Sequence, residues 1–171
     1  MTISVTAALF ASVSFFVAAI WAGVTDLLTM RIRNSLVLFL LGVYAALAPL
    51  TGWTAAEIGM SVAVAAAVLG CSFACFAAGW IGGGDAKLVA VIVLWLGAEH
   101  VTSYLLGAAL FGGGLTLMLL RFRMMTLPAF CLRVPWITRL HDRRSGVPYG
   151  VALAAAAVLV FPDTLWVKAL S

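Results

Sequence analysis

The chain has 171 residues, of which 65% are hydrophobic and only 9% are charged. Soluble domains carry about a quarter charged residues, so this composition excludes a water-soluble globular protein and indicates a multi-pass membrane protein. The formal net charge of +4 does not indicate nucleic-acid binding, because six of the ten basic residues lie between Arg121 and Arg144. A basic loop of this kind is typical of the cytoplasmic side of a membrane.

Six apolar segments are predicted to be helices, since each meets or approaches the ~20 residues needed to cross a bilayer. The first contains no Lys or Arg up to Val24, so we expect a retained span rather than a secretory signal. The sequence therefore predicts an all-α membrane protein with a polytopic bundle of about six transmembrane helices. It would form a single domain over residues 1–171. The segments are Ile3–Thr25, Ser35–Leu50, Ile58–Ile81, Ala86–Ala98, Val101–Leu120 and Gly150–Val167.

The basic residues also predict the orientation of the bundle. Nine of the ten Lys and Arg residues fall in the loops after the first, third and fifth segments, and only Lys168 falls on the other side. Cytoplasmic loops carry an excess of positive charge, so we expect these loops in the cytoplasm and both termini outside it. The longest loop, residues 121–147, is expected either to lie on the membrane lipid or to be a solvated connector.

Two carboxylates, Asp26 and Asp85, are the main candidates for chemistry. Each follows a glycine-containing segment end on the same predicted side, and Asp85 directly follows the run Gly82–Gly84. Acidic residues near apolar spans are energetically costly, which makes them functional candidates. The Ala86–Ala98 segment would rise only about 20 Å as a helix. Either the bilayer thins there, or the glycine run enters the membrane as irregular backbone.

If the bundle brings Asp26 and Asp85 within a few ångströms, the two carboxylates can share one proton. Like charges that close cannot both ionise cheaply, so they behave as a unit. The ionised carboxylate can deprotonate a water molecule while the protonated one hydrogen-bonds a peptide carbonyl oxygen, which is aspartyl-protease chemistry and needs no cofactor. The glycines allow a substrate strand to approach closely, and Lys87 is near enough to bias the charge of the pair.

Each of these residues has a second interpretation. Asp85 would also serve as the N-cap of the following helix, with the glycines as its turn. Asp26 would also serve as an interfacial acid that pairs with a neighbouring arginine. A metal site is not expected, because Cys71 and Cys75 lie one helical turn apart in an apolar segment and lack the paired spacing of zinc ligands.

The constellation resembles the type IV prepilin peptidase family, in the short form found with tight-adherence (Flp-type) pilus systems. One matching feature is Asp26 followed by a basic stretch and Asn34. A second is the GxGD signature at Gly82–Asp85, with Lys87 two residues further on. A third is the stretch Val147–Gly150 at the start of the last segment. Arg33 differs, because many members have proline there, which makes the local backbone uncertain but not the role of the aspartate.

The resemblance implies an intramembrane aspartyl endopeptidase with Asp26 and Asp85 as its catalytic pair. Its substrate would be a pilin precursor, cut between the basic leader and the hydrophobic stem at the cytoplasmic face of the bacterial inner membrane. This reaction serves pilus biogenesis and protein secretion. The cysteine-paired insert of the long form is missing, so we expect no methyltransferase activity. We assign substrate binding to the residues around the pair, namely Gly82, Gly83, Gly84, Lys87 and Asn34.

Two other functions would also use intramembrane acids. The presenilin and signal peptide peptidase group shares GxGD, but its members are larger and usually have Tyr-Asp where this chain has Thr25 and Asp26. A small ion-coupled transporter would use the two aspartates as a proton relay, although such sites lie near the membrane midplane and these acids are expected near one face.

Overall fold

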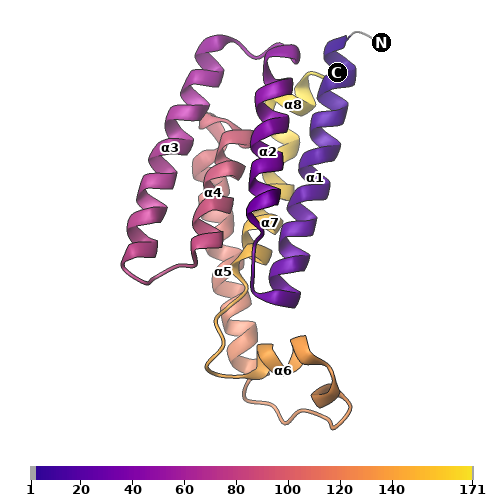
Figure 1. Ribbon diagram of the computed structural model, residues 1–171, viewed down its shortest axis with the longest axis vertical. Coiled ribbons are helices and arrows are strands. Elements are labelled where there is room, and N and C mark those ends of the chain that lie inside the picture. The colour runs from indigo at the N-terminus through magenta and orange to yellow at the C-terminus, as the bar shows by residue number, and fades with distance from the viewer. Residues whose placement is uncertain (1–2, 171) are drawn as a thin grey trace.

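The computed structural model describes residues 3–170, and the regular structure in that range is entirely helical (Figure 1). The all-α prediction is therefore confirmed. In chain order the elements are α1 Ile3–Thr29, α2 Asn34–Leu47, η1 Ala48–Leu50, α3 Ala55–Ala77, α4 Gly83–Leu96, η2 Ala98–His100, α5 Val101–Phe122, η3 Cys131–Arg133, α6 Pro135–His141, α7 Tyr149–Val160, η4 Phe161–Asp163 and α8 Leu165–Lys168. The elements named η are short 3-10 helices.

Each of the six predicted segments contains a helix, but within residues 3–170 only four helical stretches are both long and apolar enough to cross a membrane. The stretch Asn34–Leu50 is apolar but shorter, and α4 has only 14 residues. The number of spans and the side on which the termini lie stay predictions. The four candidate spans are Ser4–Thr29, Ala55–Ala77, Ala98–Phe122 and Tyr149–Lys168.

The helices form one bundle with two distinct ends. The start of α1 and the end of α8 lie at the same end (Figure 1). The α1–α2 loop, the α3–α4 loop and α6 lie at the other end (Figure 1). We call it the basic end, because nine of the ten basic residues belong to the α1–α2 loop, the first turns of α4 and residues 121–144. The arrangement agrees with the loop pattern expected from the sequence.

Helix α4 is the central element of the bundle. Its residues from Leu88 to Leu96 are all buried, and it packs against α2, α3, α5 and α7. Most of its surroundings are therefore protein rather than lipid, so its length need not match the thickness of a bilayer. Its first turn, which carries Asp85, begins within the bundle at the basic end (Figure 1).

A cluster of buried aromatic side chains holds the opposite end of α4. The indole of Trp166 in α8 donates a hydrogen bond to the carbonyl of Trp95 in α4 at 2.8 Å, and the indole of Trp95 donates to the carbonyl of Leu40 in α2 at 3.1 Å. The two indole rings lie 4.8 Å apart. Both N–H groups are thus satisfied in an apolar environment, and three helices are joined.

Replacing Trp166 by alanine is expected to destabilise the fold. The side chain is fully buried, so its removal should cost about 3–5 kcal/mol of unfolding free energy through lost packing and an open cavity. The measurement is the apparent Tm of the detergent-purified protein by scanning fluorimetry. The matched control is Trp80→Ala, since Trp80 is 77% exposed. An equal loss of Tm in both variants would contradict the role assigned to the cluster.

Candidate active site

Asp26 lies inside the last two turns of α1. The predicted end of this segment at Thr25 is wrong, because the helix continues to Thr29. Its side chain is only 5% exposed. The Oδ2 atom accepts a hydrogen bond of 2.7 Å from the backbone N–H of Gly150, in the first turn of α7. Such N–H groups have no partner within their own helix and favour a negative charge. No ion pair joins Asp26 to an arginine among residues 3–170, which argues against an interfacial acid.

Gly150 fits against Asp26 because it has no side chain. A Cβ atom at this position would lie 2.8 Å from the Cβ and 2.8 Å from the Oδ2 of Asp26, closer than non-bonded atoms can approach. The sequence analysis noted Gly150 only as part of the stretch that opens the last segment. The two residues are 124 positions apart, so no local pattern could have shown the contact.

Asp85 is the third residue of α4, and the N-cap is Gly82. The interpretation of Asp85 as the N-cap itself is therefore wrong by three positions. Its carboxylate instead lies beside the N-cap residue, since a Cβ atom on Gly82 would be 2.9 Å from the Oδ2 of Asp85. An acid at this third position is where a capping box has its carboxylate. Gly83 and Gly84 are helical, so one of the two explanations given for the short segment, irregular backbone through the whole glycine run, is wrong.

The glycines allow the N-terminus of α4 to pack closely on its neighbours. A Cβ atom on Gly83 would lie 3.2 Å from the ring of Phe76 in α3. One on Gly84 would lie 3.2 Å from the Cβ atom of Ile32, in the α1–α2 loop. The chain reaches this position by a sharp reversal at Met30, whose φ of 55° is the only positive φ at a non-glycine residue within 3–170. Left-handed backbone is unfavourable for such a residue and often occurs at functional sites.

The two acids line the same cavity, which has a volume of about 310 Å³. Gly82, Gly83 and Gly84 line it too, and the two carboxylates are close enough to interact electrostatically. We call this space the acid cavity. Substrate binding by the glycines stays a prediction. The acid cavity has three further lining residues that were not predicted as site residues, namely Met30, Arg31 and Ile32.

Lys87 and Asn34 lie next to the acid cavity but do not line it. The ammonium group of Lys87 donates a hydrogen bond of 3.2 Å to the side-chain oxygen of Asn34, so the two residues join the first turns of α4 and α2. Arg33, before Asn34, has φ −75° and ψ 135°. A proline at this position would adopt a similar φ, so Arg33 in its place does not require a different local backbone.

The basic loop, residues 121–147, packs partly on the same end of α1. The guanidinium of Arg139 in α6 donates a hydrogen bond of 2.7 Å to the carbonyl of Leu28, two residues after Asp26. Arg123 binds three carbonyl groups of the loop itself, at Leu140, Ser145 and Gly146. These bonds give the loop a defined conformation in which α6 contacts α1. Whether the loop also contacts lipid stays a prediction.

A comparison with protein families matches residues 13–117 to the type IV leader peptidase family. The chain belongs to the type IV leader peptidase family. The matched region contains both aspartates, the glycine run, Asn34 and Lys87, whereas Gly150 and the whole basic loop lie beyond it. Membership makes this a leader-peptidase-like protease and agrees with the apolar helices of a membrane protein. Comparisons with curated proteins and with solved structures gave no match.

The contact between Gly150 and Asp26 gives a prediction for the leader peptidase. Gly150→Ala should force Asp26 out of position, so precursor cleavage should be lost. Overpacking should also lower the free energy of unfolding by about 1–3 kcal/mol, which appears as a lower apparent Tm. Both are measured on purified protein. The control is Gly146→Ala, because nothing lies within 4 Å of the position where its Cβ would be. A fully active Gly150→Ala enzyme would show that this contact does not position Asp26.

Proposed function

We propose that the protein is an aspartic-type intramembrane endopeptidase that removes the basic leader from Flp-type pilin precursors, with Asp26 and Asp85 as its catalytic pair. One observation carries the proposal: two carboxylates from distant parts of the chain line one cavity. The family match supports a leader peptidase independently of that geometry. Pilin precursors are the substrate class that membership in this family implies.

The proposed reaction needs only the two carboxylates and water. The ionised carboxylate takes a proton from a water molecule, whose oxygen attacks the carbonyl carbon of the scissile peptide bond. The protonated carboxyl group donates its proton to the carbonyl oxygen. The tetrahedral intermediate then collapses, the peptide nitrogen receives a proton, and the leader and the mature pilin separate. A water molecule occupies ~30 Å³, so the acid cavity has room for water and part of a peptide backbone.

The surrounding residues would bind the substrate in distinct ways. Gly82 is exposed and has no side chain, so a substrate strand can pass close to its backbone beside Asp85. Gly83 and Gly84 have no side chains, so the first turn of α4 can lie close to Phe76 and Ile32 beside the acid cavity. Lys87 and Asn34 are proposed to contact the substrate at the margin of the acid cavity. We further propose that residues 1–171 act as one transmembrane domain in the bacterial inner membrane, with the basic end in the cytoplasm.

The catalytic pair is tested by Asp26→Asn and Asp85→Asn. Each should lower the rate of leader removal by ~10²–10⁴ or more, because an amide cannot exchange the required proton. The measurement is the mass of a Flp-type precursor co-expressed with each variant, with membrane insertion checked separately. The control is Asp142→Asn, which changes an exposed carboxylate in the basic loop.

Other results would favour other functions. Normal processing by either aspartate variant would mean that the pair is not catalytic. Cleavage within the apolar stem, rather than at the leader boundary, would place the activity with the presenilin type. Uptake driven by a pH gradient without peptide cleavage would indicate a transporter. A methyl group on the product's new N-terminus, absent when the enzyme is omitted, would contradict the proposed lack of methyltransferase activity.

A further inference from the structure

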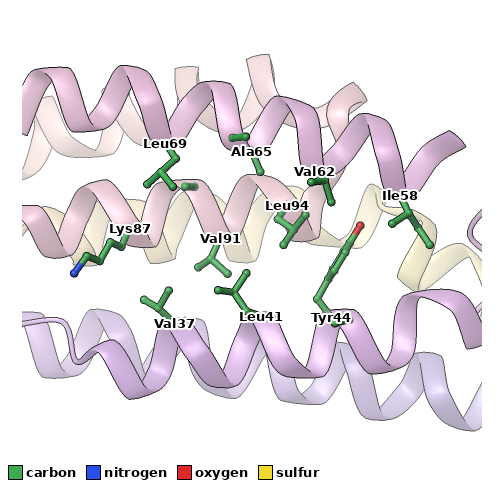
Figure 2. A pocket seen from close by; sticks show the side chains of 13 residues that line it. Val37, Leu41, Tyr44, Ile58, Val62, Ala65, Leu69, Lys87, Val91 and Leu94 are labelled. Atoms are coloured by element: carbon green, nitrogen blue, oxygen red, sulfur yellow. The ribbon is translucent and has the colours of Figure 1, made fainter. Parts of the chain in front are cut away.

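A second, larger cavity lies beside the acid cavity. It has a volume of about 760 Å³ and is bounded by α2, α3 and α4 (Figure 2). Both α2 and α3 pack on α4 but make little contact with each other. Helices α2 and α3 therefore form the two walls of the cavity, and α4 forms its floor. Leu41 on one wall and Val62 and Leu69 on the other are 40–50% exposed, which means that the space is open along its side. We call it the stem groove.

The stem groove is apolar except at its two ends. Tyr44 lies near one end and Lys87 at the other (Figure 2). Lys87 is the only charged residue among the described lining residues, and no carboxylate forms an ion pair with it within residues 3–170. A matching occupant is apolar along its length and continues at the Lys87 end into an extended segment, whose backbone carbonyl oxygens can accept a hydrogen bond from the ammonium group.

The stem groove and the acid cavity both adjoin the first turns of α4, although no lining residue is common to the two. Lys87 follows Asp85 by two residues on α4, in the first turns of the helix. On the other wall, Val37 lines the groove one turn after Asn34, to which Lys87 is bonded. An extended chain that left the Lys87 end of the groove would reach Asp85 within a few residues.

The groove is long enough to hold about three turns of a helix. The α3 wall from Ile58 to Leu69 is about 16 Å long, and a helix with its side chains is about 10–12 Å across. Small side chains allow two helix backbones to approach closely within a membrane. Such residues occur on both walls and on the floor, at Ala45, Ala65, Ala66 and Ala90.

We propose that the stem groove holds the apolar stem helix of the precursor, with the leader end of that helix at Lys87. This inference rests on the proposed peptidase function. The stem would pack on α2, α3 and α4, and the scissile bond would follow directly in the acid cavity. The groove would thereby select precursors with an apolar helix next to the cleavage site and fix the distance from the stem to the cut.

Cysteine cross-linking tests the position of the stem. The enzyme carries Cys71→Ser, Cys75→Ser and Cys131→Ser to remove its own thiols, and Asp85→Asn to keep the precursor intact. Single cysteines are then placed in the groove by Val62→Cys or Leu69→Cys. The matched controls are Ala63→Cys and Ala67→Cys, which are exposed on the same helix but do not line the groove. The probe is a full-length Flp-type precursor with one cysteine in its stem, oxidised together with the enzyme in membranes.

Groove filling gives a second measurement on the active enzyme. Ala66 lines the groove and is exposed, so Ala66→Leu should occupy space without disturbing the core. It should lower kcat/KM for the precursor about tenfold, mainly through KM, because the lost interaction is one of binding. The control is Ala67→Leu, one residue along and outside the groove.

The expected result is preferential cross-linking at the groove cysteines together with reduced kcat/KM for Ala66→Leu only. Equal cross-linking at groove and control positions would overturn the proposal, as would an Ala66→Leu enzyme as active as Ala67→Leu. In either case the groove would be a site for lipid acyl chains. These failures leave the peptidase function intact as long as the parent enzyme cleaves the precursor and the aspartate variants do not. A parent enzyme that cleaves no precursor would refute the proposed function itself.

Discussion

The hydrogen bond between the Gly150 N–H and the Asp26 carboxylate is the interaction on which the arrangement of the site depends. A buried carboxylate is costly unless donors surround it, and here the first turn of α7 supplies one at 2.7 Å. Because Gly150 has no side chain, α1 and α7 can approach until the carboxylate touches the backbone. The contact joins the first and last long helices of the chain and directs Asp26 into the bundle.

The second acid is positioned by a rigid element rather than by a flexible loop. Helix α4 is surrounded by other helices, and its far end is fixed through Trp95 and Trp166. Its first turn packs on Phe76 and Ile32 through glycines. A side chain at the start of such a helix has little freedom to move, which suits a pair of groups that must act together. The aromatic cluster thus supports the site from the opposite end of the bundle.

Much of this architecture could be predicted from the sequence because it follows from composition. Long apolar segments predict helices, and the cost of acids near spans singles out Asp26 and Asp85. Helix boundaries could not be predicted to the residue, since α1 runs past Asp26 and α4 begins before Asp85. Local sequence does not distinguish a helical glycine from one in a turn, so it leaves open whether Gly83 and Gly84 lie in irregular backbone.

Contacts between distant segments were beyond the reach of any sequence pattern. Nothing near Gly150 indicates that it faces Asp26, and nothing near Met30 indicates a left-handed residue that brings Ile32 over Gly84. The stem groove likewise arises from the separation of α2 and α3, which is a property of the whole bundle. Lys87 and Asn34 were predicted together as substrate contacts, but their bond to each other appears only in three dimensions.

The open side of the stem groove has a consequence for how a partner would arrive. Leu41, Val62 and Leu69 line it and stay partly exposed, so an apolar helix can enter sideways from surrounding lipid without leaving the hydrocarbon. The encounter then becomes a two-dimensional search within the membrane sheet. Its rate would depend on how densely precursors populate that sheet, rather than on their abundance in the cell volume.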